Sequence, residues 1–197
     1  MKTTPLVLVI GKSGSGKTTI VHEMCKNTSL IELQSYTTRK PRYTNEQGHI
    51  FTTLYDYEKD KRTKTVVAET YFDGNMYWST IPQICNADFY ILDFKGVKDI
   101  LSWIKERKFF QRKVIIVNLD ISYFESYKRQ VKRGDKRLQV IKRILNDIGK
   151  FRGMNKWLIK HQHNKEYCDY ELLFIKKGYA IYHICEYIER IVKNEYI

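Results

Sequence analysis

Hydrophobic residues in this chain fall into short continuous runs that alternate with segments of helical periodicity. Leu6 to Ile10 is an unbroken apolar run rich in β-branched residues, which is typical of a strand buried on both faces of a parallel sheet. Residues 18–26 follow a glycine-rich turn and place Ile20, Val21 and Met24 at helical spacing. The same order recurs downstream, with expected strands at 89–92, 113–119 and 171–175 and expected helices at 97–107, 123–133 and 181–192. The alternation predicts an α/β fold with a mostly parallel sheet, for which we expect five strands.

Two segments interrupt this alternation. Residues 35–80 are polar and rich in Thr and Arg, and an Asp73-Gly74-Asn75 turn separates two strand-like runs at 66–72 and 76–79. This pattern predicts a small inserted antiparallel subdomain. Residues 128–143 are dense in Lys and Arg and have almost no large aromatic side chains. We expect them to form a mobile, solvated segment that lies between two helices.

Composition narrows the choice of function. The 197 residues include 35 Lys and Arg against 22 Asp and Glu, a formal charge of +13, and 43% of them are hydrophobic. These values indicate one globular domain, and the basic surplus suits either a nucleic-acid surface or a pocket for a small phosphorylated ligand. No apolar run approaches the roughly 20 residues of a membrane span, and the apolar run near the start is too short for a secretion signal. We therefore expect a cytoplasmic location and no membrane partner.

The strongest motif is a phosphate-binding loop. Residues 11–18 read Gly-Lys-Ser-Gly-Ser-Gly-Lys-Thr and match G-x-x-x-x-G-K-[ST] in full, between a buried strand and a helix. Glycines let backbone N–H groups converge on an anion, and the following helix N-terminus adds partial positive charge. The pattern predicts a P-loop nucleoside triphosphate hydrolase-like three-layer fold that binds ATP. The donor-binding residues are expected to be Gly11, Ser13, Gly14, Ser15, Gly16, Lys17, Thr18 and Thr19.

Two side chains of the loop have distinct expected roles. Lys17 should reach the outer phosphates as a point charge, and the Thr18 hydroxyl should occupy one position on Mg²⁺, which keeps most of its own waters. Asp93 ends a neighbouring strand and could hold the same ion through water, although an Asp at a strand end is also a common turn residue. A phosphate loop alone does not name the reaction, because hydrolases, switches and kinases all use it.

A second candidate anion site follows the loop by about 20 residues. Residues 35–42 read Ser-Tyr-Thr-Thr-Arg-Lys-Pro-Arg, which places Arg39 and Arg42 three apart beside small hydroxyl side chains. A planar guanidinium binds phosphate through two parallel hydrogen bonds, so this pair predicts a second phosphate site. A solvated basic loop is the alternative interpretation.

In these segments the chain resembles guanylate kinase and its relatives, as a divergent member. The resemblance spans nearly the whole chain in the order of the family's motifs. It rests on the phosphate loop, on 35–42, on Gly74-Asn75-Met76-Tyr77-Trp78-Ser79-Thr80, on Ile91-Leu92-Asp93 with Gly96-Val97, and on Arg129, Arg133-Gly134 and Arg143. The resemblance implies one domain over 1–197, with a core (1–34, 81–127, 144–197), a monophosphate-binding insert (35–80) and a lid (128–143).

The resemblance also implies an activity and residue roles. The activity is phosphoryl transfer from Mg·ATP to a nucleoside monophosphate, with GMP or dGMP as the first candidates for the acceptor. Arg39, Arg42 and Tyr77 would hold the acceptor phosphate, while Ser35, Ser79 and Asp93 would lie near its base. Arg133 and Arg143 would close from the lid onto the transferred phosphoryl group, so the catalytic set is Lys17, Arg39, Arg133 and Arg143.

Departures from the family pattern affect both nucleotide sites, and the stretch after Asp93 is also shorter than in the family. Ala68 stands where the family has a glutamate that accepts hydrogen bonds from guanine, and Glu69 follows one position late, on the opposite face of a strand. His49 is the nearest residue to a missing phosphate-binding tyrosine. Phe174-Ile175 replaces an Asn-Asp pair near the donor base.

These departures keep other functions open. A kinase of the same fold could act on a sugar phosphate or another nucleotide. A catalytically reduced guanylate-kinase-like binding module is a second alternative, which the intact loop disfavours. The charge of +13 also leaves open a nucleic-acid partner or a nucleic-acid-end kinase. Base, sugar and oligomeric state are not determined by the sequence.

Overall fold

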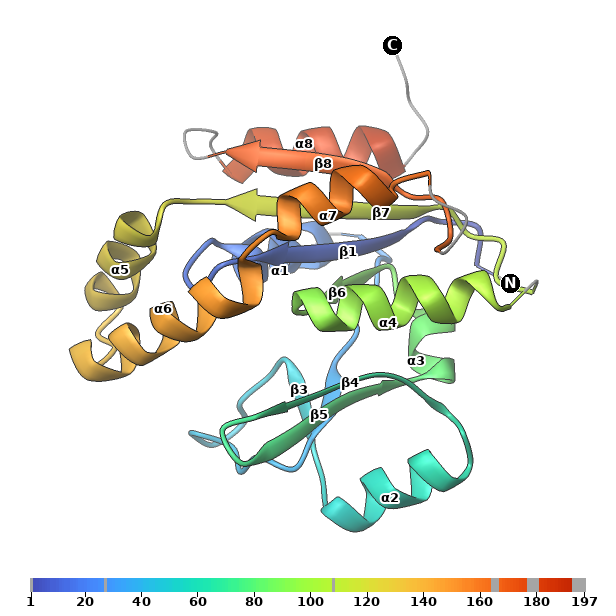
Figure 1. Cartoon of the computed structure of the whole chain (residues 1–197), viewed down its shortest axis with the longest axis horizontal. Helices are drawn as coiled ribbons and strands as arrows, with labels where there is room; N and C mark the ends of the chain where they lie inside the picture. The colour runs from blue at the N-terminus through green and yellow to red at the C-terminus, as the bar shows by residue number, and fades with distance from the viewer. Residues whose placement is uncertain (1, 27, 108, 164–166, 177–180, 193–197) are drawn as a thin grey trace.

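The core of the protein is a parallel sheet, which a computed structural model describes over residues 2–26, 28–107, 109–163, 167–176 and 181–192. Its strand order is β6-β1-β7-β8, and every neighbouring pair is parallel (Figure 1). The four strands are β1 (Leu6–Gly11), β6 (Phe89–Ile91), β7 (Val114–Asp120) and β8 (Glu171–Lys176). The α/β fold with a mostly parallel sheet is therefore confirmed.

The expectation of a fifth core strand is wrong for the described residues. Beside β6, Glu32 makes only an isolated parallel bridge to Phe89. One cause is local: the Ile31 N–H donates to the Asp88 carboxylate at 2.8 Å instead of to a strand partner. With its amide bonded to a side chain, the segment does not continue as a ladder.

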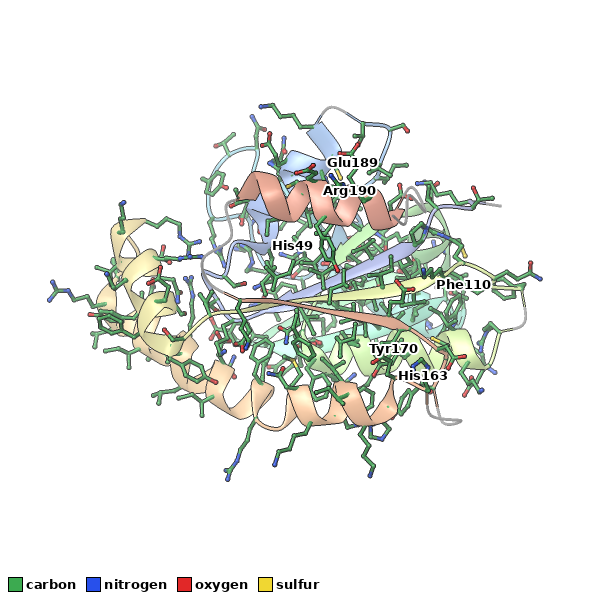
Figure 2. The ribbon with its side chains drawn as sticks, turned by 90° about the horizontal axis from the view of Figure 1, so that it is seen from above. His49, Phe110, His163, Tyr170, Glu189 and Arg190 are labelled. Carbon is green, nitrogen blue, oxygen red and sulfur yellow. The ribbon has the colours of Figure 1, made fainter. Side chains whose placement is uncertain are left out.

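Helices cover both faces of this sheet, so the molecule has three layers. The β1 side chains alternate: Leu6 and Leu8 belong to the cluster with α4 (Phe94–Lys105) and α7 (Met154–His161), and Val7 and Val9 to the cluster with α1 (Lys17–Lys26) and α8 (Ile181–Val192). Figure 2 shows α8 and the run of α6 and α7 on opposite sides of the sheet. Because both faces of the strands are buried in this way, their sequences are continuous apolar runs.

The insert forms a second sheet of order β3-β2-β5-β4. Its strands are β2 (Ser35–Thr37), β3 (His49–Phe51), β4 (Val66–Phe72) and β5 (Asn75–Thr80). The expected hairpin is present, but β2 and β3 pair in parallel, so the sheet is mixed and not purely antiparallel. The reason is the long connection over residues 38–48, which returns the chain to pair in the same direction.

Two helices in and after the insert were not predicted from the sequence. α2 (Leu54–Arg62) is almost entirely polar, and its buried residue is Tyr57; a capping box of Thr53 and Asp56 starts it. α3 (Ile81–Asn86) is a single short segment that follows β5 directly. Both lack a wide apolar stripe, which is the signal that periodicity detects.

The expected lid segment is mostly helical. Residues 128–143 comprise the end of α5 (Tyr123–Lys132), a turn and the start of α6 (Arg137–Phe151). Figure 1 shows α5 and α6 extending past the carboxyl ends of β7 and β8. None of the helices described here is both long and apolar enough to cross a membrane.

Candidate phosphate-binding and acceptor site

A cavity of about 440 Å³ lies where the carboxyl ends of the core strands face the insert and α6. Residues from four separate stretches of sequence line it. They are Gly11, Ser13, Gly14 and Lys17 from the loop, Ser35, Arg42 and Tyr77 from the insert, Asp93 before α4, and Arg133 and Arg143 from the lid segment. The fold therefore brings ten of the sequence-predicted site residues to one cavity.

The phosphate loop depends on glycine at two crowded positions. Gly11 has φ +148°, and a Cβ there would lie 2.6 Å from the Leu119 carbonyl oxygen and 2.8 Å from Ser15 Oγ. Gly14 has φ +70°, and a Cβ there would approach Gln130 Cγ at 3.2 Å. The loop thus lies tightly against β7 and α5, so that larger residues would displace it.

Lys17 begins α1 and is held against the loop itself. Its Nζ donates to the carbonyl oxygens of Gly11 at 2.7 Å and Lys12 at 3.0 Å. Burial lowers the Lys17 pKa to about 8, and the negative charge of Asp147 partly opposes that decrease. The ammonium is therefore still mainly protonated at neutral pH and loses its charge in mildly alkaline solution.

The loop also contains a polar atom suited to an incoming ligand. Ser15 Oγ is buried and has no hydrogen-bond partner within the described residues. The Thr18 side chain is exposed at the start of α1, beside Thr19. The described part of the chain holds no group of three or more His, Cys, Asp or Glu side chains that could bind a metal ion. Thr18 stays a predicted ligand of Mg²⁺, an ion that prefers phosphate and water oxygens.

The two arginines of the insert are organised by a carboxylate. Arg39 donates two parallel hydrogen bonds to Glu46, at 3.1 Å from one guanidinium nitrogen and 2.9 Å from the other. The Arg42 backbone N–H donates to the same carboxylate at 2.7 Å. Hydrogen bonding to Arg39 lowers the Glu46 pKa to about 2. Arg39 Nε is buried and lacks a partner among the described residues, and only Arg42 of the pair lines the cavity.

His49 and Ser35 lie next to this pair. The hydrogen bond between Ser35 Oγ and His49 Nδ1 is 2.9 Å long, and the His49 ring (labelled in Figure 2) meets the Tyr77 ring edge-on at 5.4 Å. Burial, followed by the charge of Arg39, lowers the His49 pKa. His49 is therefore a mainly neutral side chain of the cavity wall at neutral pH.

The strand that would read the acceptor base has alternating faces. Thr70 Oγ1 lies 3.3 Å from each Asp93 carboxylate oxygen, whereas Glu69 accepts from Tyr57 and Lys61 on the α2 side. Ala68 is buried at the cavity wall. The position expected to carry the family's glutamate therefore has no carboxylate. Glu69 also lines the cavity, but its carboxylate is bonded to Tyr57 and Lys61 of α2.

Ser79 and Asp93 differ in access to the cavity. Ser79 is fully buried opposite Ala68 in the strand register and is not part of the lining. Asp93 is part of the lining, and as the N-cap of α4 it accepts from the Gly96 N–H at 2.9 Å. It also accepts from Lys150 Nζ at 3.0 Å. Asp93 therefore has the capping role that its position after a strand allows, and it also lines the cavity.

The two arginines of the lid segment meet on a single carboxylate. Arg133 and Arg143 donate to the same oxygen of Asp135, at 2.5 Å and 2.8 Å. The hydrogen bond from Arg133 is the main cause that lowers the Asp135 pKa. Asp135 thus holds the two positive charges together at the rim of the cavity.

Sequence reasoning missed the inner face of α6. Asp147, Lys150 and Phe151 line the cavity together with Arg143, at spacings of four, three and one residues. Their spacing matches one face of a helix. Predicting a helix beyond residue 143 would therefore have placed these side chains on the same face. Phe174 and Ile175, expected near the donor base, do not line the cavity.

Comparisons with known proteins are consistent with this fold. No protein-family model matches the sequence, and no curated protein does. The solved structures include a similar one, the crystal structure of guanylate kinase from Anaplasma phagocytophilum, with a TM-score of 0.57 and 17% sequence identity. The match covers 98% of this chain and 87% of that one. At this identity the likeness establishes a guanylate kinase-like fold over almost the whole chain.

Proposed function

We propose that this protein is a nucleoside monophosphate kinase that transfers the terminal phosphoryl group of ATP to its acceptor, with GMP or dGMP as the first candidates. The observation that carries the proposal is that one cavity is lined by the phosphate loop, by Arg42 and Tyr77, and by the arginines 133 and 143. A guanylate kinase-like fold is what positions these segments around a common space. Three cationic groups from separate elements suit a reaction between two phosphates.

The proposed reaction needs alignment and charge neutralisation more than covalent assistance. An oxygen of the acceptor phosphate attacks the terminal phosphorus of ATP, and the bond from that phosphorus to the bridging oxygen breaks to release ADP. Loop amides and Lys17 would hold the donor, and Arg39, Arg42 and Tyr77 would hold the acceptor. Arg133 and Arg143 would neutralise the charge of the transferred group.

Two buried polar atoms support this division of roles. The buried Ser15 Oγ and Arg39 Nε lack partners among the described residues, and each belongs to one of the two proposed phosphate sites. When bound, Mg²⁺ supplies charge neutralisation and orientation of the donor phosphates. Ser35 and Asp93 face the acceptor side, whereas a role for Ser79 would require its burial to change.

An ADP-release assay tests the proposal directly. The protein is incubated with ATP, Mg²⁺ and each of GMP, dGMP, AMP, CMP, UMP and dTMP. We expect turnover on at least one, and a loss of about a thousandfold or more in Lys17→Ala, because a preorganised charge at the transferring phosphates is removed. Lys12→Ala is the matched control: it removes a lysine of the same loop whose ammonium is bonded to Asp120 and Ile121.

The negative outcomes are equally specific. ATP binding without turnover on all six acceptors would contradict the proposed acceptor class and favour a sugar phosphate or another nucleotide. Unchanged ATP binding in Lys17→Ala would contradict the donor site and favour a binding module.

A further inference from the structure

Helix α6 carries an acidic side chain into the phosphate loop. Asp147 Oδ2 accepts a hydrogen bond of 2.8 Å from the backbone N–H of Ser13, and Asp147 is 7% exposed. Asp147 also lies close enough to Lys17 to act on its charge. The loop, whose sequence predicts an anion-binding site, therefore binds the carboxylate of Asp147 from the protein itself.

The surrounding contacts keep this arrangement in place. On the loop side, Ser126 Oγ donates to the Ser13 carbonyl oxygen at 2.7 Å, so both polar groups of the Ser13 backbone are bonded to side chains of α5 and α6. On α6, Lys150 lies three residues after Asp147 and pairs with Asp93 at 3.0 Å. One face of α6 thus contacts the donor and the acceptor sides of the cavity together.

A carboxylate and a phosphate compete for such a position. Both are oxygen anions that accept from backbone N–H groups, and a helix N-terminus favours either one. Two anions within a few ångströms repel each other strongly in a partly buried site. A donor phosphate that takes the Ser13 N–H must therefore displace the Asp147 carboxylate.

We propose that Asp147 is an internal phosphate mimic: it occupies the donor anion site of the empty loop and must withdraw, with its segment of α6, before the donor's phosphates bind. Asp147 is a positioning residue in this scheme, because it keeps the Ser13 amide and Lys17 arranged for an anion in the absence of ligand. It also weakens donor binding, since only the fraction of molecules with Asp147 withdrawn can accept the donor. The inference rests on the proposed function only in assuming that the loop binds donor phosphates.

Titrations with ATP and with inorganic pyrophosphate, both with Mg²⁺, test the proposal. For Asp147→Asn we expect about tenfold tighter binding of both ligands, because the variant keeps an oxygen for the Ser13 N–H but lacks the competing charge. Asp147→Ala should change affinity in the same direction. Glu58→Gln removes one negative charge from an exposed position of α2 and should stay within about twofold of the unmodified protein.

The outcomes separate this inference from the proposed function. Weaker or unchanged binding in both Asp147 variants, with ATP still bound by the unmodified protein, overturns the inference alone. Failure of every form to bind ATP or pyrophosphate overturns both. Should the variants not fold, the ¹³C carboxyl resonance of Asp147 in the unmodified protein decides: saturating pyrophosphate must shift it, and an unshifted resonance rejects displacement.

Discussion

The proposed donor and acceptor halves of the cavity are built from different chemical groups of the chain. The donor half is one contiguous stretch, in which backbone amides and a helix N-terminus are the expected ligands and glycines provide the shape. The acceptor half consists of side chains from β2, the 38–48 connection, β3, β4, β5 and the start of α4, and the Glu46 carboxylate positions Arg39 and Arg42 among them. A backbone site survives divergence if its glycines remain, whereas a side-chain site changes with each substitution.

This difference explains where the chain departs from the family it resembles. The loop matches its motif at every required position, while the changes occur at side-chain positions: Ala68 and His49 on the acceptor side, and Phe174-Ile175 where the family has a pair near the donor base. A buried hydrogen-bond acceptor for a base edge can account for several orders of magnitude in discrimination. The comparison therefore predicts a donor phosphate site of ordinary character, beside base pockets that have preferences of their own.

Gly11→Ala should break the donor half most severely. The new Cβ would meet the Leu119 carbonyl oxygen at 2.6 Å in a backbone conformation that L side chains rarely adopt. We expect a loss of about 2–4 kcal/mol in the free energy of unfolding and loss of measurable ATP binding. Urea unfolding and a binding titration measure the two effects.

Gly149→Ala serves as the control for that substitution. It lies inside α6, where a Cβ meets nothing within 4 Å. Replacing a helical glycine by alanine should raise the stability by about 0.5–1 kcal/mol. Equal effects of the two substitutions would refute the view that the loop is shaped by crowding at Gly11.

Glu46→Gln should affect the acceptor half alone. The variant removes the carboxylate that aligns Arg39 and the Arg42 amide, so we expect the acceptor KM to rise about ten- to a hundredfold while the Kd for ATP changes less than about twofold. Steady-state kinetics with each substrate varied in turn separate the two constants. A larger change in ATP affinity than in acceptor KM would mean that Glu46 serves the donor side.

The pH dependence should also differ between the halves. The Lys17 pKa of about 8 predicts that ATP affinity falls above pH 8 by up to about tenfold per pH unit, because the bound phosphates require the protonated ammonium. Lys17→Met should lack this decline. An ATP affinity that stays constant from pH 7 to 10 would show that Lys17 keeps its proton throughout.

Glu46 responds at the opposite end of the pH range. Its pKa is about 2 in the folded protein and 4.5 ordinarily, so its carboxylate stabilises the fold above pH 4.5. This contribution should decrease as the pH falls from 4.5 toward 2, because the unfolded chain takes up the proton first. The acceptor half should therefore lose its organisation in acid, and the donor half its charge in alkali.

Several elements followed directly from the sequence. The buried strands at β1 and β7, the helix after the loop and the β4–β5 hairpin all have short-range signals: continuous apolar runs, helical spacing and an Asp-Gly-Asn turn. The loop needed no tertiary information, since its expected function resides in consecutive backbone groups. For the same reason its candidate residues could be named from the motif alone.

Other elements depended on partners distant in sequence. The fifth strand was reduced to a bridge because Asp88 takes the Ile31 amide, and the insert became a mixed sheet because β3 pairs with β2 in parallel. α2 formed on a polar segment by capping and by burying Tyr57. Patterns of neighbouring residues carry no information about contacts between residues that are far apart in the sequence.

The sequence by itself determined the phosphate loop, the α/β alternation and the identity of the candidate arginines, because these depend on neighbouring residues and local periodicity. Only the tertiary structure decided that Glu46 holds Arg39, that Asp135 joins Arg133 and Arg143, and that Asp147 of α6 reaches the Ser13 amide 134 positions away. The physical reason is that hydrogen bonds and charges act over a few ångströms of space. Which residues come within that distance is set by how the whole chain packs.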